Sequence, residues 1–152
     1  MGTHLWQAEH ARREMSRSTL LKAERRAAQL ASATATQMEE LVRGIDLGLQ
    51  QLRSSYGGDP AGFRQTVRSV LGTLGGGMLD QISVVSADGN LLYNSGGLPG
   101  PVNISDREHF RVHADNGADR LYIGRPVKSR ITGRWIIPVT RPSRGKVDSP
   151  VW

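Results

Sequence analysis

One stripe of apolar or small residues runs through the first third of the chain and constrains its fold more than any other feature. Successive members are three or four positions apart, the spacing that places side chains on one face of an α-helix. The stripe consists of Leu20, Ala23, Ala27, Leu30, Thr34, Met38, Leu41, Ile45, Leu49, Leu52 and Tyr56. It predicts one helix over residues 20–56, and residues 5–18 are expected to extend that helix toward the N-terminus.

Such a helix is long for a chain of 152 residues. At 1.5 Å per residue, about 50 residues would reach roughly 75 Å, which exceeds what a compact domain of this size needs. A helix that overshoots its domain packs against a second copy or continues into a membrane anchor, and a frayed start is the alternative. We therefore expect a homodimer formed through the long helix.

A second, shorter helix is predicted directly after the first. Gly57 and Gly58 end the long helix, and Asp59 then supplies an N-cap oxygen while Pro60 takes the first helical position. Glycines 75–77 end the second helix. Its buried face is expected to comprise Phe63, Val67, Val70, Leu71 and Leu74.

The remaining elements are short. An Asp-Gly turn at 88–89 separates two apolar runs and predicts a hairpin with strands over 81–86 and 91–95. Ser105 and Glu108 have capping-box spacing, which predicts a helix from Asp106 to about Ala114. Two further strands are predicted over 121–127 and 134–140, with a turn at 131–133 between them.

This order of elements predicts an α+β fold, in which a long N-terminal helix is followed by an antiparallel sheet with short covering helices. The chain is long enough for one domain with a core. The predicted organisation is a helical extension over 1–19, the domain over 20–141 and an irregular tail over 142–152.

Composition excludes several functions. The 20 basic and 14 acidic residues give a net charge of +6, but the basic residues are scattered, and no recognition helix or basic groove with interleaved aromatics is found. We therefore expect no nucleic-acid partner. The absence of cysteine excludes disulfides and thiolate metal sites.

Other motifs are also missing from the sequence. The sequence contains no run of about 18 apolar residues, the length that spans a membrane, and no signal-peptide pattern is found. Neither a phosphate-binding loop nor Gly-x-Ser-x-Gly occurs, so we expect neither an enzyme nor a cofactor.

Four segments, in this order and spacing, resemble Cache sensor domains, also called PAS-like periplasmic sensor domains. They are SADGNLLYNS (86–95), DREHF (106–110), YIGRPV (122–127) and TGRWIIPVTR (132–141). The chain is most similar to the copies at the N-terminus of membrane-bound diguanylate cyclases and sensor histidine kinases. The resemblance covers residues 20–141.

The resemblance implies a ligand-sensing input domain on the periplasmic side of the bacterial inner membrane. In such proteins, membrane helices that are absent from this chain connect the sensor to a cytoplasmic output such as a GGDEF or histidine kinase domain. The family also continues after Arg141 with a further strand, which residues 143–152 do not resemble, so we expect a PAS-like sheet whose last strand is missing through truncation or an atypical end. A structural dimerisation module without a ligand is the alternative.

The resemblance also implies a ligand pocket on the sheet face that the short helix covers. Guanidinium groups bind carboxylates in a bidentate way, and aromatic side chains line small-molecule pockets, which favours an organic acid or an amino acid. In the alternative interpretation, the aromatics belong to the core and the arginines pair with Asp106, Glu108 or Asp115. The positions that match the family's pocket are Arg107, Phe110, Tyr122, Arg125, Arg134, Trp135 and Arg141.

His109 and His113 have the four-residue spacing of metal ligands on one helix face. No glutamate lies between them as in a zincin motif, and neighbouring arginines disfavour a cation. We therefore expect no metal site.

Overall fold

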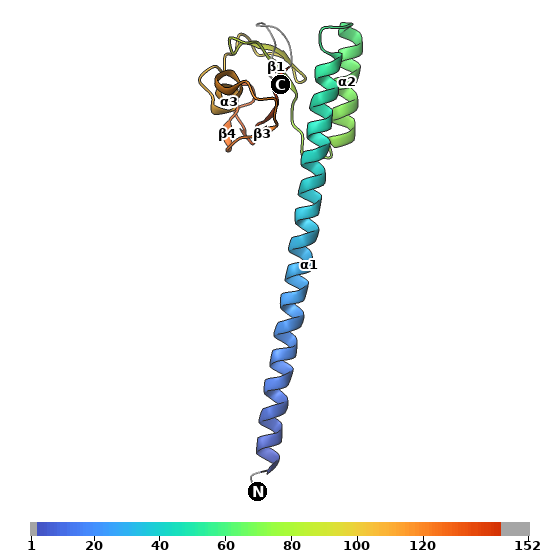
Figure 1. The fold of residues 1–152 in the computed structure, drawn as a ribbon, viewed down its shortest axis with the longest axis vertical. Coiled ribbons are helices and arrows are strands. Elements are labelled where there is room, and N and C mark those ends of the chain that lie inside the picture. Colours follow the sequence, from blue (N-terminus) through green and yellow to red (C-terminus); the bar gives the residue numbers. More distant parts are fainter. Residues whose placement is uncertain (1–2, 144–152) are drawn as a thin grey trace. The chain divides into compact units, whose positions relative to one another are not determined.

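The computed structural model describes the backbone of residues 3–143 and the side chains of residues 11–143. Within these residues the fold is α+β, as predicted, with a long N-terminal helix and small antiparallel sheets (Figure 1). The elements are α1 (Thr3–Ser55), α2 (Pro60–Leu74), β1 (Ser83–Val85), β2 (Leu91–Asn94), α3 (Glu108–Asn116), β3 (Tyr122–Ile123), β4 (Val127–Lys128), β5 (Trp135–Ile136) and β6 (Val139–Thr140).

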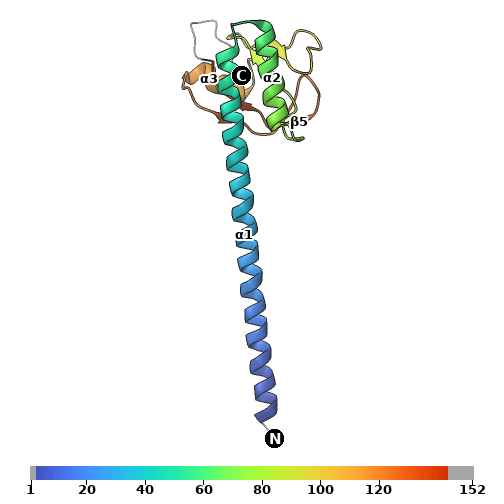
Figure 2. The same ribbon diagram turned by 90° about the vertical axis from the view of Figure 1, so that its right-hand side faces the viewer.

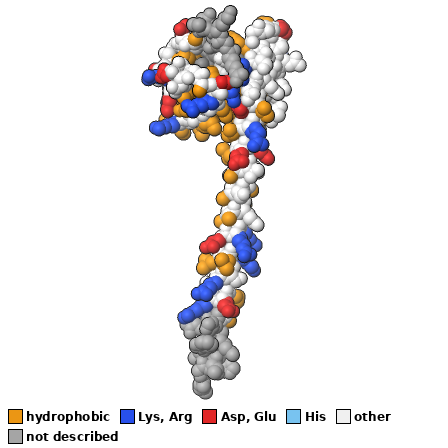
Figure 3. All heavy atoms as spheres, in the orientation of Figure 1, with side chains coloured by type: hydrophobic (Ala, Val, Ile, Leu, Met, Phe, Trp, Pro, Cys, Tyr) orange, Lys and Arg blue, Asp and Glu red, His pale blue; other side chains and the backbone are white. Residues whose placement is uncertain are grey.

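The chain divides into two compact units, Met1–Leu41 and Val42–Trp152. In the first unit, every described side chain from residue 11 to residue 40 is exposed. Hydrophobic side chains lie among Lys and Arg along this part of α1 (Figure 3), and Met15, Leu20, Leu21, Leu30 and Met38 are all more than half exposed. The single helix predicted from the stripe and its extension toward the N-terminus are confirmed. No helix among the described residues is apolar enough over 18 positions to cross a membrane.

In the second unit, the C-terminal part of α1 packs side by side with α2 (Figures 1 and 2). Two glycines of α1 allow this close approach. A Cβ atom at Gly48 would lie 2.9 Å from Cγ1 of Val70, and one at Gly44 would lie 2.8 Å from Cδ2 of Leu74. Small residues at a helix crossing therefore set the separation of these two helices.

The predicted cap of α2 is confirmed. The Asp59 carboxylate accepts hydrogen bonds from the backbone N–H groups of Ala61 and Gly62 at 3.2 and 2.9 Å, and Pro60 occupies the first helical position. Three of the five residues predicted for the buried face are fully buried, namely Phe63, Val67 and Val70, and the other two, Leu71 and Leu74, pack against the same core while partly buried.

The β1–β2 hairpin lies between the helix pair and α3. Because successive side chains of a strand point to opposite faces, Val84 packs with Leu52 and Val67 of the helices, whereas Val85 packs with Phe110 of α3. The Phe63 ring contacts Tyr93 of β2 edge to face, with centroids 5.2 Å apart. The hairpin thus contributes to two hydrophobic clusters at once.

The expected single antiparallel sheet is wrong for the described residues, which form three two-stranded antiparallel ladders, β1–β2, β3–β6 and β4–β5. The strand predicted over 121–127 is divided into β3 and β4, and the one over 134–140 into β5 and β6. Pro126 and Pro138 lie in the two interruptions, and proline has no N–H for a ladder. The segments 121–128 and 134–140 together form an interrupted hairpin. Gly124 N–H donates to the Pro138 carbonyl at 2.8 Å, which holds the two arms of the interrupted hairpin together.

The predicted capping box is also wrong. Asn103 Oδ1 accepts hydrogen bonds from both the Ser105 N–H (2.9 Å) and the Ser105 hydroxyl (2.6 Å). Ser105 is therefore held in a turn, and α3 begins at Glu108, with Arg107 as an N-cap that makes no side-chain capping bond. The predicted stop is confirmed, because Gly117 ends α3 in the left-handed conformation. No strand follows β6 up to residue 143, and most of the predicted tail lies outside the described residues.

Candidate ligand-binding site

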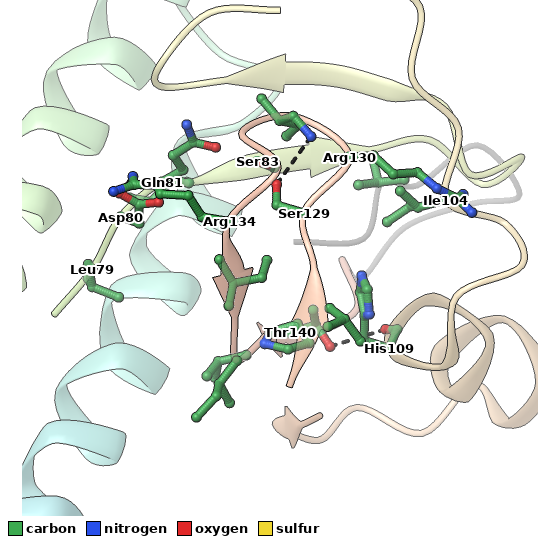
Figure 4. Close-up of a pocket in the computed structure, with 18 of the residues that line it drawn as sticks. Leu79, Asp80, Gln81, Ser83, Ile104, His109, Ser129, Arg130, Arg134 and Thr140 are labelled. Carbon is green, nitrogen blue, oxygen red and sulfur yellow. Dashed lines mark hydrogen bonds and ion pairs between the residues drawn. The ribbon is translucent and has the colours of Figure 1, made fainter. Parts of the chain in front are cut away.

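A cavity of about 600 Å³ lies within the second unit (Figure 4). The helix pair supplies an apolar wall that includes Leu49 of α1 and Leu74 of α2. Polar side chains enter from β1 and the residues before it, from the first turn of α3, and from the interrupted hairpin that carries β4, β5 and β6. The cavity therefore combines an apolar wall with a polar one, which is the usual composition of a small-molecule site.

The structure brings four of the seven predicted site residues to this cavity and leaves three outside its wall. Arg107, Phe110, Arg134 and Trp135 line it, whereas Tyr122, Arg125 and Arg141 do not. The ligand-binding role of these residues remains a prediction.

The aromatic residues differ in burial. Phe110 is 4% exposed and belongs to the cluster with Val85, whereas Trp135 is 73% exposed. Tyr122 packs its ring edge to face on His113, with centroids 6.3 Å apart. A hydrogen bond with Glu108 raises the pKa of the Tyr122 phenol. Phe110 is thus a core residue, whereas Trp135 is exposed to solvent at the cavity wall.

Two of the predicted arginines differ in their partners at the cavity. Arg134 pairs with the carboxylate of Asp80, and Figure 4 shows these side chains in contact. Arg107 instead donates from Nη2 to the Lys128 carbonyl at 3.2 Å, and no described carboxylate lies within ion-pair distance of its guanidinium. Arg107 therefore has no ion-pair partner among the described residues.

Arg141 takes part in a partly buried ion network away from the cavity wall. It donates to Asp46 of α1 and, at 2.7 Å, to Asp119, which also accepts from Arg53 at 2.9 Å. The hydrogen bond to Asp46 raises the pKa of Arg141. The network joins α1 to the residue that follows β6.

Arg130 lines the cavity but was missed from the sequence. It binds both oxygens of Asp106 at 2.6 and 2.7 Å and the Asn103 carbonyl at 2.7 Å. The hydrogen bond with Arg130 lowers the pKa of Asp106 from 3.8 to about 2. The excess of arginines near Asp106 was the signal in the sequence, yet only the folded hairpin selects which arginine pairs with it.

The two histidines of α3 lie in different surroundings. His113 is 5% exposed and lies outside the cavity wall, and its Nε2 lies 2.8 Å from Oγ1 of Thr140. That hydroxyl donates to the His109 carbonyl at 3.2 Å, so Nε2 of His113 carries the proton. Burial lowers the pKa of both His109 and His113, which keeps their rings neutral near pH 7.

His109 lines the cavity (Figure 4). The described side chains contain no group of three His, Asp or Glu placed to hold a metal ion.

Asn94 of β2 positions the polar side chains next to β1. It is 5% exposed, and its Nδ2 donates to Gln81 Oε1 at 3.1 Å and to Ser83 Oγ at 2.8 Å. Its own Oδ1 accepts from the Gly96 N–H at 2.8 Å. Gln81 and Ser83 line the cavity, so a buried amide fixes the orientation of this part of the wall.

No protein-family model matches the chain. No curated protein is significantly similar to it. Among solved structures, the chain is similar to the crystal structure of the extracellular domain of a protein assigned as the histidine kinase rpHK1S-Z16, with 24% sequence identity and a TM-score of 0.59. The match covers 76% of this chain and 52% of that one, so the chain spans about half the length of the solved domain. At this identity the similarity establishes a shared fold.

Proposed function

We propose that the chain is an extracytoplasmic ligand-sensing input domain of a bacterial transmembrane signalling protein. It senses a small anionic or zwitterionic molecule in the cavity and relays the signal through α1. The observation that carries the proposal is the cavity of about 600 Å³, whose wall joins apolar side chains of α1 and α2 to the basic side chains of Arg107, Lys128 and Arg130. The fold shared with an extracellular domain assigned to a histidine kinase supports the proposed setting.

The finer assignment is a Cache domain on the periplasmic side of the inner membrane, with a diguanylate cyclase or histidine kinase as the output. The chain itself then acts as a sensor, and catalysis belongs to the output domain. The gene sequence on both sides of this chain tests the assignment directly. Membrane-spanning segments and a GGDEF or kinase domain are expected there, and a gene that encodes neither would contradict it.

A homodimer through α1 is part of the proposal. In the first unit, Leu20, Leu30 and Met38 of the apolar stripe are 60, 70 and 51% exposed. A second copy of the same stripe would cover them, because two such helices bury their apolar faces against each other. This observation also favours the alternative function, a dimerisation module with no ligand.

Binding to the full chain distinguishes the two functions. A thermal-shift screen of organic acids and amino acids should yield compounds that raise the melting temperature, since a ligand at a hundred times its dissociation constant stabilises the folded state by about 2.7 kcal/mol. Arg107→Gln should weaken the hits, while Arg68→Gln, at an exposed position of α2 outside the cavity wall, should leave them unchanged. A screen without any hit would favour the dimerisation module.

A further inference from the structure

The wall of the cavity is unbalanced in charge. It contains four basic side chains and one carboxylate, namely Arg107, Lys128, Arg130 and Arg134 against Asp80. The first turn of α3 also lies in the wall, through Arg107, His109 and Phe110. The positive end of this helix therefore adds to the positive potential at the same place.

The carboxylate of the wall is already paired. Asp80 binds Arg134, and Arg130 is neutralised by the bidentate Asp106. Arg107 and Lys128 have no carboxylate within ion-pair distance among the described residues. The net charge that a ligand meets is therefore the positive charge of Arg107 and Lys128.

Most side-chain oxygens of the wall already accept or share a hydrogen bond, among them Asp80 Oδ1, which accepts from Arg134. The oxygens of Gln81 and Ser83 accept from Asn94. Ser129 Oγ accepts from the N–H groups of Ile131 and Thr132 at 3.1 and 3.2 Å, and Thr140 Oγ1 is bonded to His113. The wall thus offers free cationic donors and few free acceptors.

We propose that the cavity takes an organic acid without an amino group, with its carboxylate at Arg107 and Lys128 and its hydrocarbon body against the α1–α2 wall, and that it rejects α-amino acids. The inference rests on the proposed function and narrows the ligand class given there. An α-ammonium group would lose its water without a free carboxylate to pair with, and an unpaired buried charge is costly.

Matched ligand pairs test the inference by titration calorimetry on the full chain. Butanoate, hexanoate and octanoate are each compared with their 2-amino derivatives, which differ from them only in the ammonium group. We expect at least one acid to bind, and to bind at least about tenfold more tightly than its amino partner, a difference of about 1.4 kcal/mol. Amino acids that bind as tightly as the acids would overturn the inference and leave the proposed function standing. If neither set nor the wider screen binds, both proposals fail.

Two variants distinguish an effect of the charge at the cavity wall from an effect on folding. Arg107→Gln should reduce the affinity for the acid at least about tenfold, with Arg68→Gln, outside the cavity wall, as the control. Arg134→Gln releases the Asp80 carboxylate at an exposed pair and should shift the acid-to-amino-acid affinity ratio toward the amino acid. An unchanged ratio in Arg134→Gln would overturn the role assigned to the paired Asp80. Thermal melts of each variant establish that it is folded.

Discussion

Arg141, the residue that follows β6, binds both carboxylate oxygens of Asp46 on α1, with Nε and Nη2 at 2.6 and 3.0 Å. The two residues are 95 positions apart in the chain. Their side chains are 12 and 26% exposed, so solvent screens this pair far less than a surface pair. The end of the interrupted hairpin is thereby fastened to the long helix.

We expect Arg141→Ala to lower the free energy of unfolding by about 2–3 kcal/mol, because it removes the guanidinium that binds both oxygens of the partly buried Asp46 carboxylate. Arg111→Ala is the matched control. Its pair with Asp115 spans 3.7 Å and is about 60% exposed on both sides, so its loss should change stability by less than about 0.5 kcal/mol. Urea denaturation measures both, and equal losses would contradict the structural role of the network.

Gly48→Ala should destabilise the protein although alanine favours a helix. The new Cβ would lie 2.9 Å from the Val70 methyl group, and the stiff valine side chain cannot move aside without strain. We expect a net loss of about 1–2 kcal/mol. Gly72→Ala in α2 has open space around its Cβ and should gain about 0.5–1 kcal/mol. If both alanines stabilise the protein, the helices do not approach each other at Gly48.

Stability should fall as the pH drops below about 6.5. The pKa of His113 is lowered by burial from its ordinary value of 6.5, so the unfolded chain takes up a proton at a higher pH than the folded one. The contribution of neutral His113 to the free energy of unfolding is complete above pH 6.5. It is lost as the pH falls toward the folded-state pKa, by at most about 1.4 kcal/mol per pH unit for one proton.

Thermal and urea melts between pH 8 and 5 measure this slope. His113→Gln keeps a donor for Thr140 but cannot titrate, so its slope should be smaller than that of the wild type. His109, whose pKa is lowered in the same direction, accounts for a remaining slope. Identical slopes in the two proteins would exclude His113 as the titrating group.

The full chain should sediment as a dimer at high protein concentration. Leu30→Glu places a charge in the apolar stripe, at a side chain that is 70% exposed in the single chain, and should shift the equilibrium toward monomer. Ser32→Glu adds the same charge on the opposite face of α1 and should leave it unchanged. A wild-type chain that remains monomeric at every concentration would argue against the dimer.

The parts of the fold that depend on local signals were predictable. Asp59 and Pro60 mark the start of α2 because a cap and a first helical position are defined by neighbours in the sequence. The same reasoning failed at Ser105, because the Asn103 side chain competes for its N–H and hydroxyl. Pro126 and Pro138 were known from the sequence. Their effect on strand pairing depends on whether the missing proline N–H falls on the side of the strand that pairs with a neighbour.

The candidate site was less predictable because its pairs are distant in sequence. Arg134 and Asp80 are 54 positions apart, and Arg130 and Asp106 are 24 apart. No periodic pattern encodes which guanidinium meets which carboxylate, since only the folded hairpin brings these side chains within reach. Arg107, Phe110, Arg134 and Trp135 reach the cavity, and the pairing pattern distinguishes Arg107 from the other arginines.

The adjacency of Val84 and Val85 gives the hairpin a mechanical property. Val85 lines the cavity, while Val84, the next residue back, is fully buried against the helix pair. One planar, stiff peptide group joins them, so a shift of Val85 at the cavity wall also moves Val84, which packs with α1 and α2. Leu52 packs in the same cluster as Val84 and also lines the cavity, so a bound molecule would act on α1 both directly and through β1, because close-packed side chains transmit strain.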